Sequence, residues 1–316
     1  MSYGKNISVG LIVLIILMAS PWIGPKLSIA QTDFVFWQLR IPRMLMAAMV
    51  GSILATCGAA YQTIFANPLA TPSTVGTTAG ASLGALLAVL FGLQSGSALP
   101  LIPLWAFTGG LVVTFIVAGI ASSGRARVND VLLAGIAITL ATGAISTGLQ
   151  LQADMTSTFE AIRWSLGNIS QVGYQGVLLM IPFALVSITI IFSQIRALDS
   201  LVLGEDKAHS QGVSVTKVRT LTLGIGALGV GASVAWCGPI AFVGLIVPHL
   251  IRLWLGSSRR ILIPMSAICG AGFLVLCDTL ARILIPGREL PVGVITAGIG
   301  APLLVWFIAK PKNPTP

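Results

Sequence analysis

Long apolar runs, separated by short polar stretches, are the feature that most constrains how this chain folds. One run begins at Thr220, has no charged residue before Arg252 and could pass for a single helix. A single helix over that run would be far longer than the ~30 Å hydrocarbon core of a bilayer. Cys237, Gly238 and Pro239 interrupt it, because proline lacks the amide donor that a helix uses. The sequence therefore predicts two membrane spans that meet at this break.

The same criterion, about 20 apolar residues for each helical span, divides the whole chain. Charged residues make up 9% and hydrophobic residues 55% of the sequence, whereas roughly a quarter of the residues in a soluble domain are charged. Only helices fit these runs, because unpaired backbone cannot face lipid. We predict one all-α, polytopic membrane domain over residues 1–316 with ten spans, at 7–24, 43–65, 74–93, 99–121, 128–149, 176–195, 220–237, 239–255, 261–285 and 291–309.

The basic residues predict the orientation of these spans. An even number of spans places both termini on one side, and cytoplasmic loops carry an excess of Lys and Arg. With the termini inside, twelve of the eighteen basic residues are cytoplasmic: Lys5, Arg125, Arg127, Arg196, Lys207, Lys217, Arg219, Arg252, Arg259, Arg260, Lys310 and Lys312. The net charge of +9 is scattered along the chain rather than clustered. Membrane topology explains it better than a nucleic-acid partner.

The first span, 7–24, has an alternative interpretation. Ala19 and Ser20 are small residues of the kind that precede a signal-peptide cleavage site. Because many spans follow it, we interpret this run as a retained helix.

Two Gly/Pro-interrupted segments fall at corresponding places in the two halves of the chain. Asn67 and Pro68 follow the second span, and Gly238 and Pro239 follow the seventh. Broken backbone at membrane depth is found where protein or a water-filled cavity satisfies it. The pattern predicts two repeats of five spans each, inverted because five is odd. Ordinary turns between spans are the alternative.

Small residues in the second and seventh spans predict close helix packing. Such residues let helix backbones approach where lipid supplies no hydrophobic drive. They are Gly51, Ala55, Gly58 and Ala59 in the second span, and Gly224, Gly226, Gly229 and Gly231 in the seventh.

The apolar runs contain few ionisable residues. The acid that lies well inside a span is Asp278, four residues before Arg282, and we interpret the two as a self-neutralising pair on one helix face. His249 is interpreted as interfacial. The cysteines, Cys57, Cys237, Cys269 and Cys277, show no metal-ligand spacing, so no metal site is predicted. No nucleotide-binding loop, nucleophile elbow or HExxH motif is present, so we predict that this chain is not an enzyme.

Residues 194–219 form a sustained hydrophilic interval. Gly204 and Gly212 predict two short helical pieces, because glycine commonly ends a helix. Leu201, Leu203, Ala208 and Val213 would give this loop an apolar side for a partner. The alternative is a solvated connector. A second polar interval, 151–175, predicts a short interfacial helix on the outside.

Several motifs, in this order and spacing, resemble the FecCD-type permeases of bacterial ABC importers for iron-siderophore complexes, haem and cobalamin. The motifs are Leu39-Arg40-Ile41-Pro42-Arg43, Asn67-Pro68-Leu69-Ala70 with Gly76, Leu203-Gly204-Glu205 with Ala208 and Gly212, the run 238–249 with Gly238, Pro239 and Pro248, and Glu289-Leu290-Pro291-Val292-Gly293 with Gly300-Ala301-Pro302. Trp164-Ser165-Leu166-Gly167-Asn168 departs from the usual family pattern.

The resemblance implies a set of partners and roles. It implies ten helices, a homodimer or pseudo-dimer around the pathway, two cytoplasmic ATP-binding cassette subunits that use ATP and Mg²⁺, and a substrate-binding protein outside. The ATPase-coupling residues would be Leu203, Gly204, Glu205, Ala208 and Gly212, and those that dock the binding protein would be Arg40, Arg43 and Arg282. The resemblance places the cytoplasmic gate near Val128 and Asn129, and no cofactor on this chain.

From these observations we predict an ABC-importer permease in the bacterial cytoplasmic membrane that moves an iron chelate, haem or cobalamin inward by alternating access. A self-energised secondary transporter of a small metabolite is the alternative. A membrane-embedded enzyme has no supporting set of residues. The sequence does not specify the cargo.

Overall fold

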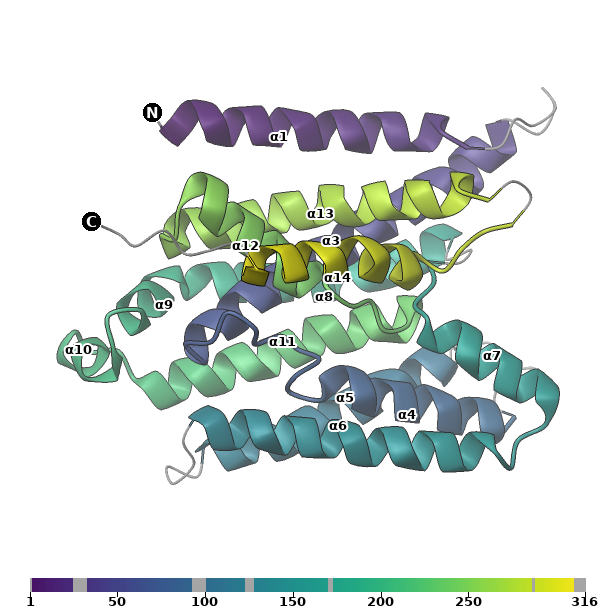
Figure 1. Ribbon diagram of the computed structural model, residues 1–316, viewed down its shortest axis with the longest axis horizontal. Coiled ribbons are helices and arrows are strands. Elements are labelled where there is room, and N and C mark those ends of the chain that lie inside the picture. Colours follow the sequence, from purple (N-terminus) through teal and green to yellow (C-terminus); the bar gives the residue numbers. More distant parts are fainter. Residues whose placement is uncertain are drawn as a thin grey trace.

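Helices account for every regular element in the described part of the chain. The computed structural model describes residues 2–24, 33–92, 101–122, 128–169, 173–285 and 288–309. The helices lie side by side in one bundle, with most of their axes along a common direction (Figure 1). This arrangement confirms the predicted all-α membrane fold.

Ten of these helices coincide with the ten predicted spans. They are α1 (Ser2–Ala19), α3 (Ile41–Ile64), α4 (Thr77–Leu90), α5 (Leu101–Ser122), α6 (Val128–Gln150), α8 (Gly173–Ser193), α11 (Val215–Cys237), α12 (Val243–Leu255), α13 (Arg259–Ile283) and α14 (Val292–Ala309). Within the described residues, seven helices are long and apolar enough to cross a membrane, whereas α4, α12 and α14 are shorter apolar helices. Ten complete crossings therefore stay a prediction.

The predicted starts of several spans differ from those of the helices. α4 and α12 begin at Thr77 and Val243, later than the predicted 74 and 239, because irregular backbone occupies the residues before them. The second span begins earlier than the predicted 43, because the π-helix η2 (Val35–Arg40) runs directly into α3. Pro42 fits there, since the first turn of an α-helix needs no amide donor.

The irregular segments before α4 and α12 lie at opposite ends of the bundle. Residues 65–76 leave the end of α3 near α10 and run back toward the middle, where α4 begins (Figure 1). Residues 238–242 leave the other end of α11 and also run inward, to α12. Each segment ends in a left-handed residue, Gly76 with φ 90° and Phe242 with φ 69°. Opposite ends and matching local geometry agree with the predicted inverted repeats.

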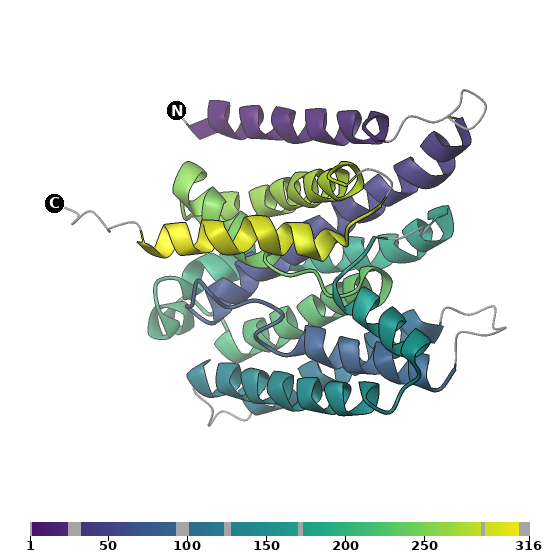
Figure 2. The same ribbon diagram turned by 45° about the vertical axis from the view of Figure 1, so that its right-hand side comes forward.

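One end of the bundle collects the elements that were predicted to be cytoplasmic. The start of α1, the end of α14, and the short helices α9 (Ile195–Leu201) and α10 (Glu205–Ser210) all lie toward this end (Figure 2). α7 (Met155–Ser165) lies at the other end and confirms the short helix predicted within 151–175. Below, the end with α10 is called the inner end and the end with α7 the outer end.

Glycines bring α3 against two neighbouring helices at backbone distance. A Cβ on Gly51 would collide with the backbone of Gly270 on α13, and one on Gly58 would collide with Gly244 on α12. Gly80 on α4 and Gly109 on α5 face each other in the same way. The prediction of close packing is confirmed for α3. It is wrong for Gly224 on α11, which has open space beside it.

We predict that Gly58→Ala destabilises the protein by about 1–3 kcal/mol or more, because a methyl group has no room between α3 and α12. The measurement is thermal unfolding of the purified protein in detergent, together with its yield from membranes. Gly224→Ala is the matched control, and we expect it to be neutral or slightly stabilising, since alanine favours a helix interior. Equal stability of both variants would contradict the packing argument.

Candidate functional site

The inner end presents a short helical pair between α8 and α11. α9 and α10 are separated by Gly204, whose φ of 107° is a conformation that glycine adopts readily. α10 ends at a second left-handed glycine, Gly212 with φ 78°. The amide of Val213 reaches back to the carbonyl of Ala208 at 3.0 Å, as in a Schellman cap. The two predicted helical pieces are confirmed.

The turn between α9 and α10 exposes apolar side chains. Val202 is 53% exposed and Leu203 57% exposed, directly before Gly204. Ala208 is fully buried, so the prediction that it offers apolar surface to a partner is wrong. Its methyl group packs inward, where it holds α10 in place. The exposed apolar surface is therefore the turn with Val202 and Leu203.

Ion pairs fasten this helical pair to the bundle. Glu205 accepts a hydrogen bond from Arg219 of α11 at 2.8 Å. Asp199 of α9 accepts from the backbone amide of Arg259 at 3.3 Å, at the start of α13, and lies 3.8 Å from Arg260. The two members of each pair lie far apart along the chain, so no local sequence pattern predicts these contacts. The residues of the predicted coupling loop are therefore attached to α11 and α13.

The outer end holds a buried cluster of charges around Asp278. This side chain is 2% exposed, and its two carboxylate oxygens accept hydrogen bonds from Nε of Arg43, at 2.9 Å to Oδ1 and 3.2 Å to Oδ2. Nε of Arg282 lies 3.3 Å from it. Glu289, which is 58% exposed, accepts from Nη1 of Arg43 at 2.7 Å. The predicted pair of Asp278 and Arg282 is thus part of a four-residue cluster that joins α3, α13 and the segment before α14.

The three arginines predicted to dock a binding protein all have partners within the chain. Arg43 and Arg282 are buried, and Nη1 of Arg282 donates to the carbonyl of Ile23 at 3.1 Å. Nη1 of Arg40 donates to the carbonyl of Pro21 at 3.1 Å. Each side chain lies at the predicted outer end. Their docking role stays a prediction, while Arg43 and Arg282 also neutralise Asp278.

The predicted broken-helix residues lie in the two irregular segments, apart from Pro248. In the first segment, Oδ1 of Asn67 accepts a hydrogen bond from the backbone amide of Leu69 at 2.9 Å, across Pro68, which stabilises the irregular backbone there. Gly238, with φ 67°, ends α11, and a Cβ there would collide with the carbonyl of Trp164. Pro239 follows it. Pro248 lies inside α12 and is buried.

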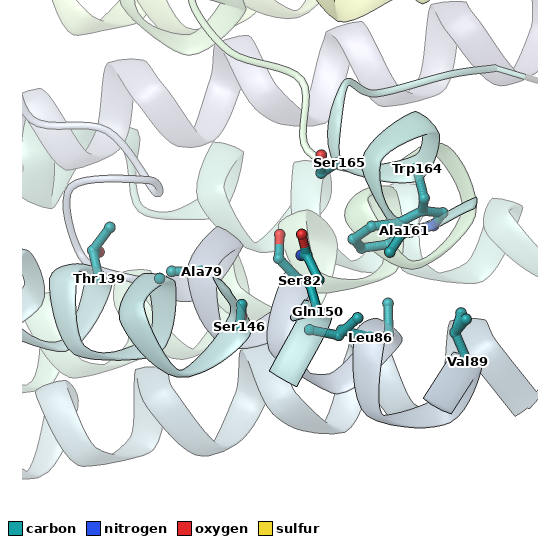
Figure 3. Close-up of a pocket in the computed structure, with 12 residues that line it drawn as sticks. Ala79, Ser82, Leu86, Val89, Thr139, Ser146, Gln150, Ala161, Trp164 and Ser165 are labelled. Carbon is teal, nitrogen blue, oxygen red and sulfur yellow. The ribbon is translucent and has the colours of Figure 1, made fainter. Parts of the chain in front are cut away.

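A cavity of about 240 Å³ lies between α4, α6 and α7 (Figure 3). Its polar wall consists of hydroxyl and amide groups, and its apolar wall of small aliphatic side chains and one indole ring. The lining residues are Ala79, Ser82, Ala85, Leu86, Val89, Thr139, Gly143, Ser146, Gln150, Ala161, Trp164 and Ser165. None of them is charged. The cavity suits water or an uncharged polar group.

The remaining predicted residues give less information. Val128 and Asn129 begin α6, and their side chains lie outside the described residues. The four cysteines are free thiols, three of them buried. No group of three or more His, Cys, Asp and Glu residues that could hold a metal ion occurs within the described part of the chain.

Comparisons with known proteins agree with one another. The sequence model of the FecCD transport family matches residues 7–310. The vitamin B12 import system permease protein BtuC of Vibrio cholerae is 36% identical, over 94% of this chain and 90% of that protein. The hemin transport system permease protein HmuU of Yersinia pestis is also 36% identical, over 88% and 84% of the two chains.

Two further comparisons extend this set. The Fe(3+) dicitrate transport system permease protein FecD of Escherichia coli K12 is 36% identical, over 88% of this chain and 86% of that protein. A solved structure described as an inward-facing conformation of a metal-chelate type ABC transporter is similar with a TM-score of 0.89 and 29% identity. It covers 98% of this chain and 100% of its own.

We predict that Asp278→Asn destabilises the protein by about 3–5 kcal/mol, because it leaves Arg282 buried without its counter-charge and leaves Arg43 with only the exposed Glu289 as a partner. Thermal unfolding in detergent and the amount of protein in membranes measure this change. Glu289→Gln is the control at the exposed side of the cluster, and we expect it to cost at most about 1 kcal/mol. A stable Asp278→Asn variant would show that the cluster does not hold the outer end together.

Proposed function

Because the chain belongs to the FecCD transport family, we propose that it is the membrane-spanning permease subunit of an ATP-driven importer. The proposed cargo is an iron chelate, haem or cobalamin, which moves from the outer side into the cytoplasm. The named relatives are permeases of import systems for vitamin B12, hemin and iron dicitrate, which supports this range of cargo. ATP would be hydrolysed by separate ATP-binding cassette subunits.

The observation that carries this proposal is the α9–α10 pair at the inner end. Val202 and Leu203 present two adjacent apolar side chains beside a glycine turn, and ion pairs attach the flanking helices to the bundle. An apolar anchor that fills a pocket and is surrounded by polar contacts is how protein interfaces gain affinity. We propose that this turn inserts into a groove of the ATPase subunit.

Import would proceed by alternating access. The irregular segment 65–76 interrupts the first half of the chain and the segment 238–242 interrupts the second half, at opposite ends of the bundle. Helices on either side of each segment could tilt relative to one another there. The uncharged cavity between α4, α6 and α7 is too small for such a cargo, and it would hold water within the subunit. Val128 and Asn129, at the start of α6, would lie near the cytoplasmic gate.

A second copy of the chain would complete the pathway. α6 exposes Leu133 and Leu140 on one face, and α14 exposes Val305 and Trp306. Exposed apolar side chains on both helices are compatible with a homodimer in which α6 and α14 lie along the axis. At the outer end, a substrate-binding protein would bring carboxylates to the surface around Arg40, Arg43 and Arg282. Arg40 is partly exposed and could pair with them directly, whereas Arg43 and Arg282 are buried and would act through their positive charge.

The alternative, a self-energised secondary transporter, has less support. Such transporters bind the coupling ion with ionisable groups at membrane depth. The buried acid Asp278 is already neutralised by two arginines. It therefore does not resemble a free coupling-ion site.

We expect proteoliposomes that contain this chain, its ATPase and its binding protein to import a chelate only when ATP is supplied. The measurement is uptake of radiolabelled iron chelate, haem or cobalamin, with a proton gradient and no ATP as the comparison. Gradient-driven uptake by this chain alone would establish the alternative instead.

We also predict that Gly204→Pro leaves the chain inserted but reduces uptake, because proline holds φ near −65° and Gly204 has φ 107°. Uptake and ATP hydrolysis are measured in the same vesicles. Gly256→Pro is the matched control, since Gly256 has a similar φ of 102° at the turn between α12 and α13 and also has open space around it. Equal loss of uptake in both variants would mean that backbone strain, not the coupling turn, is responsible.

A further inference from the structure

The last turn of α3, residues 61–64, is a junction between helices of the inner end. The hydroxyl of Tyr61 donates to the carbonyl of Leu223 on α11 at 3.0 Å. Nε2 of Gln62 donates to the carbonyl of Gly244 on α12 at 3.1 Å. Tyr61 is fully buried and Gln62 nearly so, so water does not replace these bonds readily. α11 and α12 are therefore both fixed to this single turn.

Arg219 connects the junction to the coupling turn. It lies one helical turn before Leu223 on α11, and its side chain is 14% exposed. The same nitrogen, Nη2, donates to Glu205 at the start of α10 at 2.8 Å and approaches the carbonyl of Ile64 at 3.4 Å. Ile64 is the final residue of α3, whose carbonyl is not used within the helix. One guanidinium group thus touches α10 and α3 from α11.

The contacts continue from the junction into α12. Oε1 of Gln62 accepts from Nη2 of Arg252, in the last turn of α12, at 2.6 Å. On the same helix, the ring centre of His249 lies 4.6 Å from the ring centre of Phe307 on α14. Residues that are distant in the sequence therefore form a continuous chain of contacts from α10 through α3 to α12 and α14.

We propose that Arg219 is a positioning residue that transmits movement of α10 to the last turn of α3 and, through Gln62, to α12. This inference rests on the proposed function, in which α10 moves with the ATPase. α10 has six residues, too few to be stable alone, so its position depends on its attachments. A partner that displaces Glu205 would pull the guanidinium group away from Ile64 and remove the contact through which Arg219 holds α10 to the last turn of α3.

The test is a double-mutant cycle on the complete importer in proteoliposomes. The variants are Glu205→Ala, Arg219→Ala, the double alanine variant, and the charge swap Glu205→Arg with Arg219→Glu. Cargo imported per ATP hydrolysed is the coupling ratio, and it is measured with the ATPase rate and the amount of ATPase that co-purifies. Lys217→Ala is the matched control, since it removes an exposed cation two residues away on α11.

We expect each single alanine variant to lower the coupling ratio by about fivefold or more, the lower range of couplings between distant sites. The double variant should be no worse than either single one, because both remove the same contact. The charge swap should recover most of the ratio. Lys217→Ala should leave it unchanged, and Arg219→Ala should co-purify as much ATPase as the unaltered importer.

Three outcomes would overturn the inference. They are a normal coupling ratio in Arg219→Ala, additive losses in the double variant, and loss of ATPase binding in Arg219→Ala, which would make Arg219 part of the docking surface. None of them contradicts the proposed function, provided that the unaltered importer takes up cargo with ATP. Absence of ATP-driven uptake by the unaltered importer would refute the proposed function itself.

A second measurement separates transmission from simple stability. Spin labels at Leu221 on α11 and Leu253 on α12, both exposed, report the distance between these helices. A non-hydrolysable ATP analogue should change that distance in the unaltered complex and leave it unchanged in Arg219→Ala. The same change in both proteins would contradict transmission through Arg219, even if the variant were less stable.

Discussion

The structure depends on one constraint, that backbone polar groups within a bilayer must find partners in the protein. Uninterrupted helices satisfy it within themselves. The irregular segments before α4 and α12 do not, so their backbone groups need partners from elsewhere in the chain. In the first segment, the side chain of Asn67 accepts a hydrogen bond from the backbone amide of Leu69. At the edge of the second segment, the backbone amide of Asn168 donates a hydrogen bond to the carbonyl of Cys237 at 2.7 Å. The shortness of α4 and α12 follows from the same constraint.

Much of the fold could be predicted from local patterns. Apolar runs placed the helices, and Gly204 and Gly212 ended the short helical pieces, because these signals lie within a few residues of their effects. The predicted starts of α4 and α12 were wrong, because uncharged residues continue into the irregular backbone just before Thr77 and Val243. Hydropathy does not distinguish buried irregular backbone from a helical turn.

The sites were less predictable, because their contacts are long-range. The sequence paired Asp278 with Arg282, four residues away, but gave no signal for Arg43, on a different helix. Ala208 was assigned to a contact surface from its apolar character, although it is buried. Glu205 was identified from a motif, while its partner Arg219 lies beyond the reach of any periodicity.

The glycine contacts of α3 determine which parts of the chain can move separately. Gly51 and Gly58 bring its backbone against Gly270 and Gly244, so α3, α12 and α13 interlock without side chains between them. Such surfaces cannot slide by small steps, because any shift would drive one backbone into another. These three helices therefore behave as one rigid body. Movement within the subunit must then take place at the boundaries of this body, including those with α8 and α11, and α11 in turn packs against α4 and α5.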